Sequence, residues 1–298
     1  MPFPVVDVSV WQVMELEATG QNRHPWLRAD RTGEAWLFKP VVVKNGHRQG
    51  EDWSEKLASL VGRGLGVPCA DIELARRGSD EGCISRDLKP RHGWQLQTGA
   101  LLLTDVIPDY VSQDVRRRGH NLENIQTALE GIGAPPEFVG PQMSAFDVFA
   151  GYLVLDAVIA NQDRHDENWA VLRPPGSAGS DRLCGSYDHS SSLGFNLRDQ
   201  ERRQRLDEGL LDVWVQRGRA TRFDWSTSGK AESLVTLAAT GLRLCSSAVR
   251  HHWLSAVDLL PVNELSLQAE QIPVMSELAV TFALEVVERN RRRVLDEF

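Results

Sequence analysis

The chain has 298 residues, a net charge of −8, 42% hydrophobic residues and 25% charged residues. These proportions are ordinary for a soluble globular protein, and they exclude collagen-like, mucin-like and intrinsically disordered chains. The acidic balance argues against a protein that coats nucleic acid or an anionic membrane. Four widely spaced cysteines without a C-x-x-C pair argue against a disulfide framework or a zinc site.

The first part of the chain is expected to be rich in strands. Patterns of apolar and turn-forming residues predict strands over residues 5–11, 34–43, 70–75 and 82–88, with a hairpin turn at 76–81. A single helix is expected over residues 51–63, because Trp53, Leu57 and Leu60 recur at helical spacing. Gly64 and Gly66 are positioned to end this helix.

The second part is expected to be helical. A short helix is predicted over 121–130, and Ser144 is placed to cap a helix over 145–160 that is apolar on nearly every side and therefore buried. Two short strands (168–172 and 183–187) follow, and further helices extend from residue 201 to a last helix at 275–294. The pattern predicts an α+β fold of two lobes, a strand-rich N-terminal lobe (1–108) and a helical C-terminal lobe (109–298). Without a signal-peptide pattern or a span long enough for a bilayer, we expect a cytoplasmic protein that does not bind membranes.

One polar passage, residues 161–169, directly follows the expected buried helix. It places Asp163 five positions before Asn168, and Asp188 follows after the second short strand. In protein kinases a base aspartate, a metal-binding asparagine and a metal-binding aspartate occur in this order and at this spacing. The chemistry requires a carboxylate at the attacking hydroxyl and oxygen ligands for Mg²⁺. The alternative for Asp163 and Asn168 is a loop in which both side chains cap backbone groups.

A lysine is expected to contact the ATP phosphates. Lys39 is one of five lysines and lies in an apolar strand, where its charge needs an anionic partner. Glu55, within the expected helix, and Glu51, at the start of that helix, are the candidate partners. As an alternative, Lys39 lies exposed on an edge strand, which the following Pro40 would suit.

These motifs resemble those of a known family. The residues from Asp163 to Asn168 resemble the D-R-H-x-x-N catalytic loop of phosphoinositide kinases, and together with Lys39-Pro40 and Asp188 they resemble HipA-type serine/threonine kinases. The resemblance implies a bilobal kinase fold, here as a compact member consisting of the kinase core. It also favours Glu55 as the partner of Lys39.

The resemblance implies further site residues. Residues 84–88 are similar to the hinge of the family, so backbone at Ser85, Arg86 and Asp87 is expected to hold adenine. His165 is expected to position the base loop or to contact the γ-phosphate. Residues 18–25 correspond to the phosphate loop, and because they contain no serine, self-inactivation by autophosphorylation is not expected to follow the family pattern.

We therefore expect an ATP- and Mg²⁺-dependent kinase. The resemblance implies a serine or threonine of a protein as acceptor, of the translation-related kind on which toxin–antitoxin kinases act, and an antitoxin-like partner. Direct binding of nucleic acid is not expected. The alternatives are a small-molecule or lipid kinase of the same fold, and a nucleotide-binding regulatory module without catalysis.

Overall fold

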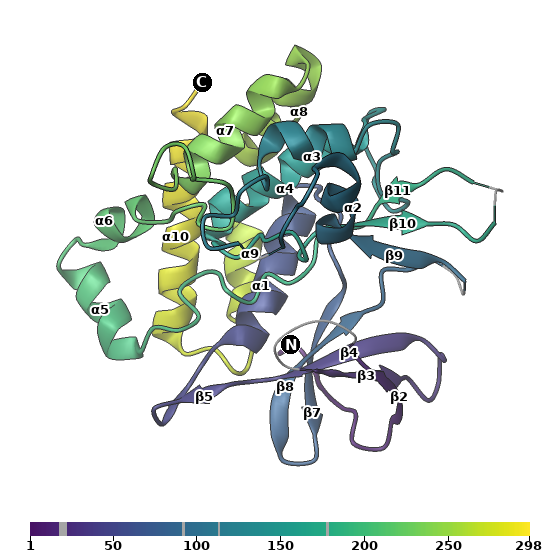
Figure 1. The fold of residues 1–298 in the computed structure, drawn as a ribbon. Coiled ribbons are helices and arrows are strands. Elements are labelled where there is room, and N and C mark those ends of the chain that lie inside the picture. Colours follow the sequence, from purple (N-terminus) through teal and green to yellow (C-terminus); the bar gives the residue numbers. More distant parts are fainter. Residues whose placement is uncertain (18–22, 91–92, 113, 177–178) are drawn as a thin grey trace.

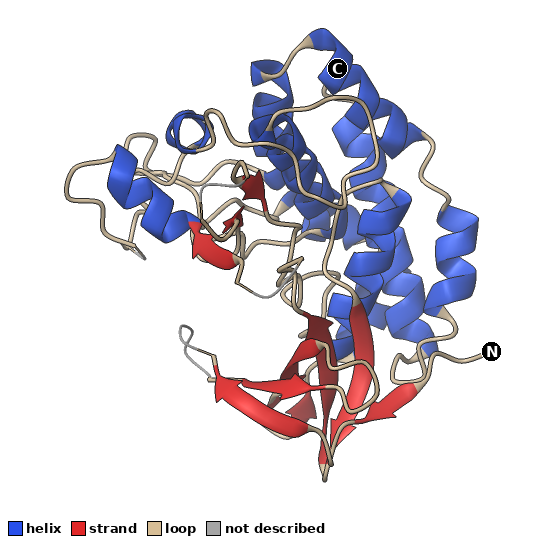
Figure 2. Cartoon of the chain, turned by 90° about the vertical axis from the view of Figure 1, so that its right-hand side faces the viewer, coloured by secondary structure: helices blue, strands red, loops and turns tan. Residues whose placement is uncertain are grey.

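The computed structural model describes residues 1–17, 23–90, 93–112, 114–176 and 179–298. The described chain has a strand-rich N-terminal lobe and a helical C-terminal lobe, as Figure 1 shows. Figure 2 shows the larger sheet on one side of the molecule and most of the helices on the other. The expected two-lobed α+β architecture is confirmed.

The described strands are β1 (Val5–Asp7), β2 (Gln12–Leu16), β3 (Pro25–Arg28), β4 (Ala35–Pro40), β5 (Val43–Lys44), β6 (His47–Arg48), β7 (Ile72–Arg77), β8 (Asp80–Arg86), β9 (Gln95–Thr98), β10 (Ala170–Arg173) and β11 (Arg182–Leu183). The described helices are α1 (Glu51–Gly64), α2 (Gly99–Val106), α3 (Leu122–Ala128), α4 (Ala145–Ile159), α5 (Asp199–Asp207), α6 (Leu211–Gln216), α7 (Leu234–Leu244), α8 (Ser247–Asp258), α9 (Val262–Ala269) and α10 (Glu277–Leu295).

The N-terminal lobe is built on a six-stranded sheet in the order β1-β7-β8-β4-β3-β2. β4 pairs antiparallel with β8, and this pairing places Lys39 opposite Cys83 near the middle of the sheet. Helix α1 packs against β7 and β8 and also reaches α4 in the other lobe. Its apolar side chains Trp53, Leu57 and Leu60 are buried in the large core cluster. Helix α1 therefore connects the sheet of the N-terminal lobe to the C-terminal lobe.

Helix α4 forms the centre of the C-terminal lobe. Every residue of α4 except Asp147 is buried, and α7 and α10 pack against it. A capping box between Ser144 and Asp147 starts the helix, as the sequence predicted from Ser144. Ala160 ends it in the left-handed conformation (φ 56°), which turns the chain sharply into residues 161–169. Such a conformation is costly for a residue with a Cβ atom and is often found next to functional segments.

The sequence patterns did not predict strands β2, β3, β6 and β9 or helix α2. All residues of β2 are exposed, so it lacks the alternation of burial that reveals a strand, and β3 and β9 are only four residues long. Helix α2 begins at Gly99 without a side-chain cap. β9 pairs antiparallel with β10 of the C-terminal lobe. The boundary near residue 108 stays a prediction.

Candidate active site at the junction of the lobes

The passage 161–169 is held against the end of α4 by its own polar side chains. Asn161 donates from Nδ2 to Asp156 Oδ1 (2.7 Å) and accepts at Oδ1 from the backbone N–H of Asp163 (3.1 Å). Arg164 forms a buried two-point ion pair with Asp156, at 2.8 Å for both contacts, and donates to the Asn168 carbonyl (2.7 Å). Removing either partner would leave an unpaired buried charge, which is costly. Because Arg164 bonds both Asp156 at the end of α4 and the carbonyl of Asn168, it holds the loop in this conformation.

Asp163 is directed away from this buried network. Its side chain is 29% exposed, and its Oδ1 accepts from Arg222 Nε at 2.6 Å. Its backbone carbonyl accepts from Asn168 Nδ2 (2.8 Å), which links the two residues of the motif directly. Arg222 lies between α6 and α7, 59 residues away in the chain, and no local sequence signal connects it to the loop.

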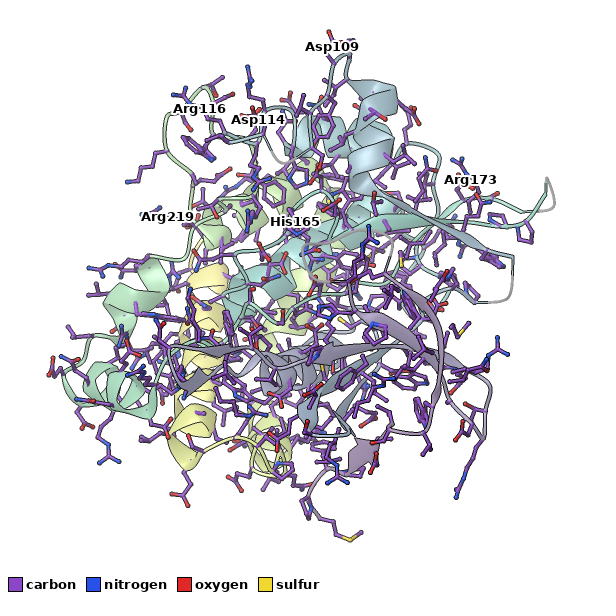
Figure 3. All side chains as sticks on the ribbon, turned by 60° about the horizontal axis from the view of Figure 1, so that its bottom comes forward. Asp109, Asp114, Arg116, His165, Arg173 and Arg219 are labelled. Atoms are coloured by element: carbon purple, nitrogen blue, oxygen red, sulfur yellow. The ribbon has the colours of Figure 1, made fainter. Side chains whose placement is uncertain are left out.

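His165 is half-buried on the same loop. Its Nδ1 accepts from the backbone N–H of Glu167 (3.2 Å), so the side chain helps to shape the turn. His165 also lies near Asp188. Figure 3 shows His165 near the middle of the molecule, between the two lobes. The structure thus brings His165 toward the candidate metal ligand.

Lys39 meets Asp188 across the lobes. Its Nζ lies 2.7 Å from Asp188 Oδ1, although 149 residues separate them in the chain. Burial alone would lower the pKa of Lys39, but attraction by Asp188 and Glu55 outweighs burial and raises that pKa. Burial would raise the pKa of Asp188, and Lys39 instead holds it below its usual range. Both groups are therefore charged at neutral pH.

Glu55 is buried beside this ion pair. Its Oε1 accepts from the backbone N–H of His189 (3.0 Å), and its Oε2 has no hydrogen bond within the described part of the chain. Burial raises the pKa of Glu55, while the Lys39 charge opposes that rise. The ion pairs within 4.0 Å among the described residues do not include Lys39 with Glu55. The expected contact between Lys39 and Glu55 stays a prediction, and here Glu55 instead holds the turn that carries Asp188.

A second buried chain of hydrogen bonds joins the two halves of the site. Arg164 donates to Ser186 Oγ (2.8 Å), and Ser186 Oγ lies 2.7 Å from His189 Nε2. Burial and the nearby Arg164 charge lower the pKa of His189, so this histidine is neutral at pH 7. Asp188 itself has a positive φ of 60°, a conformation that aspartate tolerates better than most residues. Arg164, Ser186, His189 and Glu55 together fix the Asp188 turn relative to the loop that carries Asp163.

The expected hinge covers the last two residues of β8, Ser85 and Arg86, and the next residue, Asp87. Ser85 pairs with Leu37 in the sheet. The N–H of Arg86 donates to the Asp71 carbonyl, and the N–H of Asp87 donates to the Ala35 carbonyl (2.9 Å each). These two donors are thus engaged by the sheet, so adenine would have to be held by other backbone groups of this segment. The Arg86 side chain pairs with Glu34 (2.6 Å). Most of the predicted phosphate loop, residues 18–22, lies outside the described residues.

The donor set fits a Mg²⁺ ion bound together with phosphates. Mg²⁺ is usually held by one or two protein oxygen ligands, with phosphate oxygens and water completing its shell. Asn168 uses its amide nitrogen on the Asp163 carbonyl, which leaves its oxygen as a ligand, and Asp188 supplies a carboxylate that is ionised. Phosphate oxygens and water would complete the shell of an ion held by Asn168 and Asp188. Within the described ranges no group of three or more His, Cys, Asp or Glu side chains is arranged to hold a metal ion.

Comparisons with known proteins complete the description. No family model matches the chain, and no curated protein matches it. Among solved structures, the proinflammatory kinase CtkA of Helicobacter pylori matches with a TM-score of 0.75 and 17% identity, covering 98% of this chain and 96% of that one. HipA of Shewanella oneidensis, solved with HipB and operator DNA, has a TM-score of 0.49 and 12% identity, covering 99% and 67%. A Golgi casein kinase has a TM-score of 0.41 and 11% identity, covering 98% and 74%.

The match to CtkA extends over nearly the whole of both chains, so it concerns the complete fold and not a shared fragment. Among the described residues, no helix combines the length and apolar character needed to cross a membrane. The chain has the bilobal kinase-like fold that its resemblance to HipA-type kinases predicted.

Proposed function

We propose that this protein is an ATP- and Mg²⁺-dependent kinase that phosphorylates a serine or threonine hydroxyl of a protein. The observation that carries the proposal is the 2.7 Å contact between Lys39 and Asp188, which joins the lobes beside Glu55 and the Asp163–Asn168 loop. A kinase needs these residue types at one place, and phosphoryl transfer depends on their positioning and charge more than on covalent chemistry of the protein.

Each residue has a role that suits its environment. Asp163 is partly exposed, so its carboxylate can accept the proton of the acceptor hydroxyl as that oxygen attacks the γ-phosphorus. The bond from the γ-phosphorus to the bridging oxygen breaks, and ADP leaves. Lys39 would contact the phosphates, and Asn168 and Asp188 would hold Mg²⁺, which neutralises charge on the phosphate oxygens. Glu55 keeps the Asp188 turn in place.

Three further predictions come from the sequence. The motif resemblance predicts a translation-related acceptor protein and an antitoxin-like partner, and the absence of a signal-peptide pattern predicts a cytoplasmic location. The kinase fold supports phosphoryl transfer in general, and it is equally compatible with a small-molecule or lipid acceptor.

The first test separates transfer from nucleotide binding. Labelled ATP is incubated with host-cell lysate and either wild-type protein or Asp163→Asn, which keeps an oxygen for Arg222 but removes the proton acceptor. We expect transfer into a protein band to fall by about 100-fold or more, with ATP affinity unchanged. Asp188→Ala should instead weaken Mg²⁺-dependent ATP binding, and Asp30→Ala, an exposed aspartate of the N-terminal lobe, serves as control.

The outcomes are distinct. Full activity of Asp163→Asn would refute its role as base. Labelling of a small molecule instead of a protein would show that the protein is a kinase whose acceptor is not a protein. Tight Mg²⁺-ATP binding without transfer to any acceptor would identify a regulatory nucleotide-binding module.

A further inference from the structure

Two loops of the C-terminal lobe are joined beside the candidate base. The backbone N–H of Trp225 donates to the Arg116 carbonyl (3.2 Å), and that of Asp224 donates to the His120 carbonyl (2.8 Å). The Asp224 carboxylate accepts in return from the N–H of Gly119 (2.8 Å). Residues 116–120 and 219–225 therefore form one hydrogen-bonded unit, although they are about a hundred residues apart in the chain.

This unit is attached to the catalytic loop at both ends. Arg222 donates to Asp163 Oδ1 (2.6 Å), and the backbone N–H of Arg219 donates to Gln162 Oε1 (3.1 Å). On the other side, Trp169 Nε1 donates to His120 Nε2 (3.1 Å). Anything bound on the two loops is therefore held at a fixed position relative to Asp163.

The unit has an excess of positive charge. We define the arginine surface as Arg116, Arg118, Arg219 and Arg222. Arg118 is paired with Asp114 and Arg222 with Asp163. Among the described residues, no carboxylate lies within 4.0 Å of the Arg116 or Arg219 guanidinium, and Arg116 instead lies over the Trp225 ring at 5.9 Å. Figure 3 labels Arg116 and Arg219 on the left side of the view and His165 nearer its middle.

The positive excess runs against the charge of the whole protein, which is −8. A local surface of opposite sign next to a reactive group selects ligands by charge complementarity. Binding of nucleic acid would require many phosphate contacts over a larger basic face, and the acidic remainder of the chain opposes it. An acidic segment of a protein requires only a few such contacts.

Resting on the proposed function, we propose that the arginine surface binds acidic side chains next to the acceptor hydroxyl of the protein substrate. Arg116 and Arg219 are specificity residues that engage the flanking carboxylates. Arg222 and Asp163 remain part of the catalytic machinery and are not altered in the test.

The test uses two serine peptides that differ only at the flanking positions, which hold glutamate in one and glutamine in the other. Kinetics are measured for wild type, for the double variant Arg116→Gln/Arg219→Gln, and for Arg31→Gln, an exposed arginine of the other lobe. We expect the double variant to raise KM for the glutamate peptide by about 3- to 30-fold, the range set by two exposed ion pairs. The kcat should stay within about twofold, because ground-state contacts alone are lost.

Binding of the same peptides, labelled with a fluorophore, is followed by anisotropy without ATP. The glutamate peptide should bind wild type more tightly than the glutamine peptide, and rising salt should remove the difference. Equal binding of the two peptides, tighter binding of a single-stranded RNA, or an unchanged KM in the double variant would overturn the proposal. If neither peptide is phosphorylated by wild type, the proposed function is in doubt, while the anisotropy result still decides the role of the arginine surface.

Discussion

At the scale of single residues, the site depends on ion pairs of two kinds. Arg164 and Asp156 are buried and bonded at two points, so they set the shape of the loop. Arg222 and Asp163 are partly exposed, with 37% and 29% of their side chains accessible, so their pairing contributes little to overall stability. Arg222 holds Oδ1 of Asp163, and under the proposed function the second carboxylate oxygen would face the acceptor hydroxyl.

Replacing Arg222 should therefore affect turnover more than stability. In Arg222→Gln we expect kcat to fall by about 10- to 100-fold, since loss of a fixed orientation at a reacting group has this effect. The KM for ATP and the melting temperature should change little. Arg217→Gln, an exposed arginine of the same segment, is the matched control. An unchanged kcat in Arg222→Gln would show that the ion pair does not position the base.

At the scale of elements, His120 connects three segments of the C-terminal lobe. Its Nδ1 donates to the Arg222 carbonyl (2.6 Å), its Nε2 accepts from Trp169, and its ring stacks on Phe223 with centroids 4.6 Å apart. Both ring nitrogens are satisfied only in the neutral form. Burial lowers the pKa of His120 from 6.5 to about 4.

This lowered pKa predicts a pH dependence of stability. Above pH 6.5 both folded and unfolded states carry a neutral His120, so its contribution is complete. As the pH falls from 6.5 to 4, the unfolded state takes up a proton that the folded state does not, and the free energy of unfolding decreases by up to about 3 kcal/mol. Urea unfolding at several pH values measures the free energy of unfolding of each variant. This free energy should depend less on pH in His120→Gln than in wild type, and as in wild type in the exposed control His251→Gln. Parallel profiles of wild type and His120→Gln would contradict this assignment.

At the scale of the whole molecule, the C-terminal lobe has a much larger apolar core than the distal part of the N-terminal sheet. One large apolar cluster extends from α1 through α4 to α10, whereas the distal part of the larger sheet has a small cluster of five buried residues, Val8, Leu27, Phe38, Ala75 and Ile84. The lobes are joined by α1 and by the contact between Lys39 and Asp188.

Hydrogen exchange should reflect this difference. We expect the amides of α4 to exchange only through global unfolding, and those of the exposed strand β2 to exchange faster by about 100-fold or more, because local opening of β2 exposes little apolar surface. Helix α10, packed along α4, should behave like α4. Equal protection of β2 and α4 would indicate that both lobes open together.

The sequence by itself determined the main helices and the order of the chemical groups. Ser144 and the apolar run after it predicted α4, and the spacing of Asp163, Asn168 and Asp188 with Lys39 upstream predicted a kinase-like fold, which the structure and its match to CtkA confirm. These features are local, since a cap, a helical period and a loop motif are each encoded within a few residues. The roles of the individual site residues stay predictions.

Only the tertiary structure decided which side chains meet. The Lys39–Asp188 contact spans 149 residues, Arg222 reaches Asp163 over 59, and His189 reaches Glu55 over 134. The arginine surface likewise arises from two loops that are distant in the chain. Such contacts depend on how α1, α4 and the loops pack, and packing is a property of the folded chain that no local pattern of residues records.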